Sequence, residues 1–181
     1  AMGFIEYITP TQLDELIKLS FDNLSSNGSI CIGSRNRLFN LTTFNSYTNM
    51  EVELGVIETL LKESEVIISA KTNSEFLNNL RSFSDNHNLI QNEKHPITNI
   101  EVETRYQFTP SDLLARVELA GFEVQKIYPV NYHAFNPTLI SSNDLKTLKR
   151  EISELISNKY QDYHQLLPDS SSFVLEAKKC R

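Results

Sequence analysis

The chain has 181 residues, a formal net charge of −6, and apolar and charged fractions of 40% and 22%, values typical of one soluble globular domain with its own core. The acidic balance argues against nucleic acid as the main partner, because such proteins concentrate basic charge. No apolar run approaches the roughly 20 residues that cross a bilayer, and two cysteines make no disulfide framework. We therefore expect a cytoplasmic protein with no membrane span.

The first helix is predicted to begin after Thr9, because Thr9-Pro10-Thr11-Gln12 supplies an N-cap, a proline at the first helical position and a capping-box glutamine. Apolar residues then recur on one helix face: Leu13, Leu16, Ile17, Phe21 and Leu24. The turn over 25–28 ends the helix and leads into a short apolar strand at 30–33. Helix, tight turn and strand form half of a β-α-β crossover.

This strand runs directly into Arg35, Asn36 and Arg37. Two guanidiniums and an amide at a strand end either cap the strand with solvated charge or form a rim around a ligand. Because ligands collect outside the carboxyl ends of strands in open α/β sheets, we favour the rim. Cys31 lies inside the strand and is predicted to be a core residue rather than a nucleophile.

A helical insertion is predicted over residues 49–84. A capping box at Thr48–Glu51 and the apolar spacing after it predict a helix that continues to residue 70. A shorter helix is predicted from about Ser74, and the polar stretch 82–98 is predicted to be a loop. These helices interrupt the α/β alternation and are expected to lie over one end of the sheet.

Alternation resumes with an extended segment at 100–108 and a helix that is capped at Thr109-Pro110 and stopped by Gly121. A strand at 122–130, an amphipathic helix after residue 143 and a strand at 172–177 complete the pattern. Arg105-Tyr106-Gln107 forms a second polar cluster. The basic residues Lys146, Lys149 and Arg150 are predicted to lie on the solvated side of their helix.

His133 follows the strand at 123–130, where a loop could present it as a base near neutral pH. A hydrogen-bonded loop histidine is the alternative interpretation. The four histidines show no metal-ligand spacing. The five glycines form no phosphate loop in a strand-to-helix turn.

The order of "FIEYI", the capped helix, "GSRNRLF", "TRYQFTPSDLL", "AGFEV", "PVNYHAFNP" and "LLPDSSSFVLEAKK" resembles the C-terminal half of a class I S-adenosylmethionine-dependent methyltransferase. Phe4–Ile8 is similar to the segment after the fourth strand of that fold. Ile30–Ile32, Phe122–Tyr128 and Phe173–Ala177 are similar to its fifth, sixth and antiparallel seventh strands. The resemblance implies an α/β chain that forms the C-terminal part of a Rossmann-like methyltransferase sheet, with a helical insertion.

The chain departs from this family where the family binds its cofactor. The glycine-rich loop after the first strand and the acidic residue after the second have no counterpart here, so no cofactor-binding residue is assigned. We therefore expect residues 1–181 to be a single, incomplete (truncated) domain. An upstream segment, a partner chain or a homo-oligomer would complete the sheet at its unpaired edge.

The resemblance implies S-adenosylmethionine as cofactor and a small, anionic or glycosylated molecule as acceptor. Glu6 and Tyr7 match the region that borders the methyl group and the acceptor, and Glu6 or His133 is the candidate base. The predicted acceptor-binding residues are Tyr7, Arg35, Asn36, Arg37, Arg105 and Tyr106. The competing hypothesis is a non-catalytic α/β module that binds a protein partner through its open sheet edge.

Overall fold

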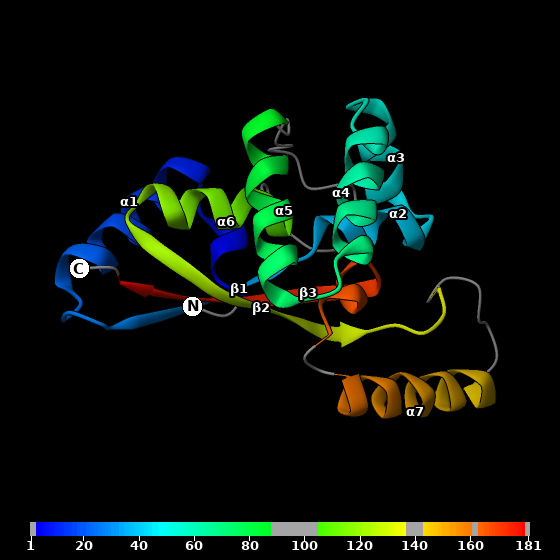
Figure 1. The fold of residues 1–181 in the computed structure, drawn as a ribbon. Helices are drawn as coiled ribbons and strands as arrows, with labels where there is room; N and C mark the ends of the chain where they lie inside the picture. Colours follow the sequence, from blue (N-terminus) through cyan, green and yellow to red (C-terminus); the bar gives the residue numbers. More distant parts are fainter. Residues whose placement is uncertain (1–2, 88–104, 137–142, 161–162, 180–181) are drawn as a thin grey trace.

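The computed structural model describes residues 3–87, 105–136, 143–160 and 163–179 (Figure 1). Its sheet has three strands, β1 (Ser29–Arg35), β2 (Phe122–Tyr132) and β3 (Ser170–Lys179), in the order β1-β3-β2. β3 is antiparallel to both neighbours, so β1 and β2 run in the same direction without pairing. The predicted mixed α/β class and the antiparallel direction of the strand at 172–177 are confirmed.

Helices cover one face of this sheet. In Figure 1, α1 (Pro10–Asn23), α5 (Asn73–Asn86) and α6 (Pro110–Leu119) lie on the same side of the strands. Successive strand side chains point to opposite faces, and Phe173, Leu175 and Ala177 of β3 are fully buried while Val174 and Glu176 between them are half-buried. The core therefore lies between β3 and the helices.

Sequence signals at the helix ends act as predicted. Thr9 and Gln12 form the capping box of α1, and the Thr109 hydroxyl accepts a hydrogen bond from the backbone N–H of Asp112 at 3.3 Å. Gly121 adopts a φ of +101°, and a Cβ there would lie 2.9 Å from the Phe21 ring. The glycine therefore both ends α6 and lets α1 pack against the turn into β2.

The predicted long helix of the insertion is interrupted. Gly55, with a φ of +68°, separates α3 (Ser46–Glu53) from α4 (Ile57–Ser69), and a short α2 (Asn40–Thr43) precedes them. The N-cap of α3 is Asn45, with Thr48 as its capping-box partner rather than the cap itself. The continuation of helix to residue 69 and the helix near Ser74 are confirmed.

Two further expectations about connections need correction. α5 extends to Asn86, so the predicted loop does not begin at residue 82. β2 continues through Pro129 to Tyr132, because Pro129 stands in an edge strand where it leaves no ladder donor missing. The remainder of the predicted loop and residues 100–104 of the extended segment lie outside the described residues.

Cys31 is exposed, and its predicted place in the core is wrong. Ile32 is buried toward α1, α5 and α6, so its neighbour Cys31 points to the opposite face of the sheet. The apolar run suggested a strand covered on both faces, whereas β1 is covered on one.

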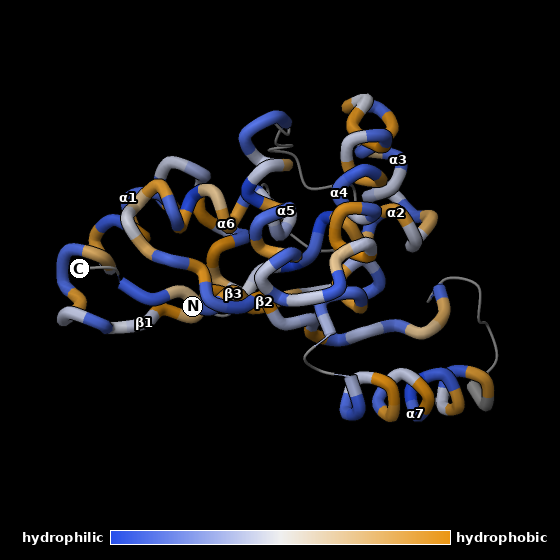
Figure 2. Tube along the Cα trace, viewed as in Figure 1, coloured by the Kyte–Doolittle hydropathy of each residue, from blue (hydrophilic) through white to orange (hydrophobic). Residues whose placement is uncertain are grey.

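Helix α7 (Asn143–Tyr160) lies on the other side of the sheet from α1, α5 and α6 (Figure 1). The helix is confirmed, but its leucines are not covered: Leu145, Leu148 and Leu155 are 54%, 51% and 68% exposed, while Ile152 and Ile156 are half-buried and Ser153 is buried. Figure 2 shows apolar and polar residues alternating around this helix, which stands apart from the main layer. No helix within the described ranges is long and apolar enough to cross a membrane.

Candidate functional site

The three polar residues at the end of β1 have separate surroundings. Asn36 is buried, and its amide nitrogen donates to the carbonyl oxygens of Leu167 at 2.6 Å and Ser170 at 3.0 Å. Its amide oxygen accepts from the backbone N–H of Leu38 at 3.1 Å. Asn36 therefore ties the end of β1 to the start of β3 and caps the 3₁₀ turn at Arg37–Phe39.

Arg37 forms a buried ion pair with Glu51 of α3. Its Nε and Nη2 lie 2.9 Å from Oε1 and 2.7 Å from Oε2 of Glu51, with exposed side-chain fractions of 3% and 1%. Asn40 adds a hydrogen bond to Glu51 at 2.8 Å and another to Gln107 at 2.6 Å. The ligand-binding roles predicted for Asn36 and Arg37 stay predictions, and both side chains contact protein groups here.

Arg35 belongs to a different cluster, centred on Glu6. The buried carboxylate of Glu6, in the 3₁₀ turn η1 (Ile5–Tyr7), accepts a hydrogen bond from Nε of Arg105 and lies 3.3 Å from Nε of Arg35. The Arg105 guanidinium stands 5.7 Å from the centroid of the Tyr7 ring, and the buried Tyr106 donates its backbone N–H to the Glu6 carbonyl at 2.8 Å. Five of the predicted site residues therefore lie together.

A hollow of about 340 Å³ opens beside this cluster. Because β1 and β2 run in the same direction, their carboxyl ends meet at one end of the sheet, where α/β proteins bind ligands. Glu6 and Arg35 line the hollow from one side and Asn131 from the other. The remaining lining residues are Gly3, Gly33, Ser34, Val130 and Ser171–Val174.

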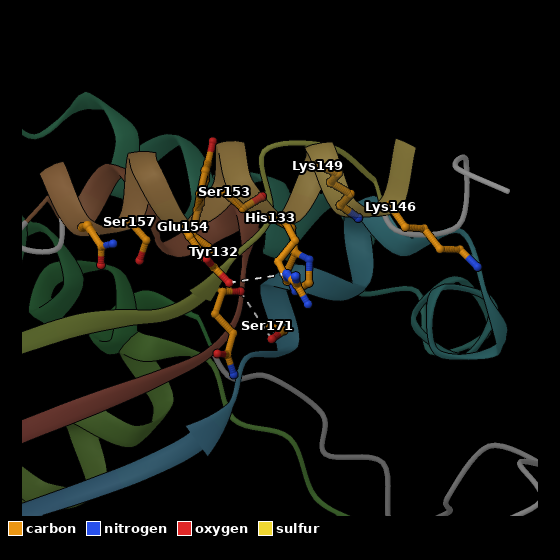
Figure 3. A pocket seen from close by; sticks show the side chains of 11 residues that line it. Tyr132, His133, Lys146, Lys149, Ser153, Glu154, Ser157 and Ser171 are labelled. Carbon is orange, nitrogen blue, oxygen red and sulfur yellow. Dashed lines mark hydrogen bonds and ion pairs between the residues drawn. The ribbon is translucent and has the colours of Figure 1, made fainter. Parts of the chain in front are cut away.

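A second, larger cleft of about 700 Å³ lies between the end of β2 and α7 (Figure 3). It shares Asn131 and Ser171 with the first hollow, so the two lie next to each other at the carboxyl end of the sheet, and together they are called the groove below. His133 lines this cleft opposite α7, and Figure 3 shows Lys149 and Ser153 close to it. The other lining residues are Tyr132, Lys146, Arg150, Glu154, Ser157 and Asn158.

His133 is half-buried, and both its ring and its backbone contact neighbouring residues. Its ring stacks on Phe39 with 4.8 Å between centroids, and its backbone N–H donates to the carbonyl of Asp169 at 2.9 Å. Burial, and then the charge of Lys149, lower the pKa of His133 below the ordinary value of 6.5. The imidazole is therefore neutral near pH 7 and can accept a proton, as a general base must.

Helix α7 contributes one wall of this cleft, which was not predicted from its sequence. Lys146 and Arg150 are exposed as predicted, Lys149 is half-buried, and all three line the cleft. Ser153 and Ser157 share that face, and the Ser153 hydroxyl accepts the backbone N–H of Ala134 at 3.0 Å. Small polar side chains on the same stripe as the cations were the available signal that this face packs against the protein.

The described residues do not fit the methyl donor by themselves. Gly33 lies within β1, and Gly28, Gly55 and Gly121 stand in turns that leave helices. Such turns lack the strand-to-helix geometry that cradles a nucleotide. No described residue is therefore assigned to bind the cofactor. Across the same described ranges, no group of three His, Cys, Asp or Glu side chains could hold a metal ion.

No protein-family model and no curated protein matches the chain. Among solved structures, a SAM-dependent methyltransferase from Archaeoglobus fulgidus is similar over 98% of this chain, with 18% identity and a TM-score of 0.42. The chain spans 57% of that protein's length. Fold and site together define a mixed α/β protein with a polar groove at the carboxyl ends of its two parallel strands.

Proposed function

We propose that the chain is the acceptor-binding half of an S-adenosylmethionine-dependent methyltransferase that acts on a small molecule. The observation that carries the proposal is the groove, which gathers Glu6, Arg35 and His133 from three distant segments at the end of the sheet where ligands bind. The sequence resemblance supplies the reaction class. The antiparallel direction of β3, which that resemblance implies, supports it.

Methyl transfer mainly requires that the acceptor be held in line with the methyl group, because proximity and orientation supply much of the rate. The bound cofactor would supply that methyl group. Arg35 is half-exposed at the rim and orients an anionic or carbonyl oxygen of the acceptor. Glu6, engaged by two guanidiniums, positions Arg35 and Arg105. Neutral His133 takes the proton from an acceptor hydroxyl onto a ring nitrogen.

The cofactor-binding half would come from another segment or chain that pairs with the outer edge of β1. No strand of the described residues pairs with this edge, and unpaired N–H and C=O groups form a template for a further strand. Such pairing would extend the sheet beside the Glu6 cluster and place the methyl donor next to the groove.

Transfer of a labelled methyl group from S-adenosylmethionine tests the proposal. The natural protein would be incubated with fractions of a cellular small-molecule extract, and label would be followed into a small product. We expect His133→Asn to lower the rate by at least about 100-fold, the lower end of a general base's usual contribution. Arg35→Gln should raise KM with a smaller effect on kcat, because it removes binding to the acceptor.

Lys62→Gln is the matched control, since Lys62 pairs with Glu58 on the exposed side of α4, away from the groove. It should leave transfer unchanged. Incorporation that is equal in all three variants, or that is absent from every fraction, would overturn the proposal.

One observation favours a second candidate, a module that binds a protein strand. An apolar hollow of about 190 Å³ runs between α1 and β1, lined by Leu13, Ile17, Ile30, Cys31 and Ile32 among others. Apolar side chains beside an open edge suit a partner strand that adds to the sheet. This candidate predicts tight partner binding that is indifferent to His133→Asn.

A further inference from the structure

The cleft between β2 and α7 has an excess of positive charge. Lys146, Lys149 and Arg150 line it from α7, and Glu154 is the carboxylate that lines it with them. Of these cations Lys149 is half-buried, whereas Lys146 and Arg150 are exposed to solvent where they line the cleft.

Carboxylates of the protein neutralise the positive charge of these cations only in part. Neither Lys146 nor Lys149 has a carboxylate within 4.0 Å among the described residues. Arg150 contacts Glu154 at 3.7 Å, and both side chains of this pair are largely exposed. Lys149 also repels a proton from the imidazole of His133. An anion in the cleft would offset these unfavourable terms.

Hydroxyl groups complete the donor set. Ser153 and Ser157 of α7 and Tyr132 at the end of β2 line the cleft together with the cations, and Figure 3 shows these side chains around one space. Ser171, at the start of β3, also lines the cleft, and its hydroxyl donates to the carbonyl of Asn131 at 3.4 Å. The volume of about 700 Å³ is in the range of small-molecule sites. It leaves room for a molecule attached to the anion.

We propose that this cleft binds the phosphate group of a phosphorylated small molecule. Lysine ammonium groups act as point-charge partners for phosphate, and serine and tyrosine hydroxyls donate to its remaining oxygens. The molecule attached to the phosphate would extend past Asn131 and Ser171 toward Arg35. This proposal rests on the proposed function for the ligand's role as methyl acceptor, and it names the acceptor's class.

The test is a titration of the chain with inorganic phosphate and with glucose 6-phosphate, followed by the NMR signal of the His133 ring. We expect saturable shifts and a rise in the pKa of His133 on binding, because a bound anion opposes the effect of Lys149. Lys149 faces the ring from α7, and Asp169 faces it from the 3₁₀ turn before β3. The backbone carbonyl of Asp169 accepts a hydrogen bond from the backbone N–H of His133.

Lys149→Ala should weaken binding by at least about 10-fold, the usual effect of removing a charged hydrogen-bond partner. Lys149→Arg, which keeps the charge, should restore it to within a few-fold. Lys18→Ala is the matched control, because Lys18 pairs with Asp22 on the exposed face of α1, away from the cleft. The affinity of the Lys18→Ala variant for phosphate should equal that of the unchanged chain.

No saturable shift, or equal weakening by Lys18→Ala, would overturn the proposal. Sedimentation with anionic phospholipid vesicles distinguishes the source of the phosphate: binding to vesicles without binding to soluble phosphates would also overturn it. The assay contains no methyl donor. A failure of methyl transfer therefore does not affect a positive phosphate-binding result. A failure of phosphate binding likewise does not affect a positive methyl-transfer result.

Discussion

Residues at the end of β1 differ in role according to which side of the strand they face. Arg35 points to the groove, whereas Asn36 and Arg37 turn inward to partners on other elements. The sequence correctly places all three at a strand end. It does not reveal their distant partners, such as Ser170 and Glu51, because these lie 134 and 14 residues away along the chain and depend on the tertiary fold.

The first prediction concerns the buried Arg37–Glu51 pair. Arg37→Met should reduce the free energy of unfolding by about 3–5 kcal/mol, because it leaves the Glu51 charge buried without its guanidinium partner. The double variant Arg37→Met/Glu51→Leu should recover much of this loss. Urea denaturation measures both, and Lys62→Met, which breaks an exposed pair, should change stability by less than about 1 kcal/mol. Equal losses in the single and double variants would contradict the prediction.

The helices are the part of the fold that the sequence predicts best. Thr9, Thr109 and Gly121 act through contacts within a few residues, so local spacing identifies them. The break at Gly55 was missed because apolar spacing continues across it and one glycine is tolerated in a helix. The exposure of Leu145, Leu148 and Leu155 on α7 was not predicted, because amphipathic spacing normally marks the face that a helix buries.

Glu63 links two of these helices and makes their packing sensitive to pH. Its carboxylate, on α4, accepts the backbone N–H of Ser111 at the start of α6 at 2.9 Å. Burial raises the pKa of Glu63 from 4.5 to about 7. Between these values the folded chain binds more protons than the unfolded chain, so stability falls as pH rises through this window.

A Glu63→Gln variant tests this sign. Glutamine keeps an oxygen for the Ser111 N–H and carries no charge, so its contribution should not change with pH. From the shift of pKa from 4.5 to about 7, the variant should gain up to about 3 kcal/mol relative to the natural chain between pH 4.5 and pH 8. Urea denaturation at several pH values measures the difference. A difference that stays constant with pH would contradict the assignment.

At the scale of the whole molecule, the sheet is covered on one face and open along β1. Within the described residues, the outer edge of β1 has no paired strand and an apolar hollow runs beside it. Both proposed functions use this edge, either for the rest of an enzyme or for a partner protein. The groove at the carboxyl end of the sheet would border whatever pairs there.

Cys31 offers a probe of this edge, because it lies exposed on β1. In a Cys180→Ser background, alkylation of Cys31 in the monomeric chain should approach the rate of an unfolded control. Pairing of another strand with β1 should slow it by at least about 10-fold, since side chains of the added strand would stand next to the thiol on the same face. Light scattering records the assembly state alongside. Strong protection of Cys31 in a proven monomer would contradict an open edge.

The central position of β3 also bears on how the chain folds during synthesis. β1 and β2 do not pair with each other, and their common partner follows both of them in the sequence. No strand pairing of this sheet can form until residues 170–179 have left the ribosome. Sheet formation is therefore late and non-local, which slows folding and leaves two unpaired strands on the nascent chain. During that interval only the locally capped helices can form ordered structure from this part of the chain.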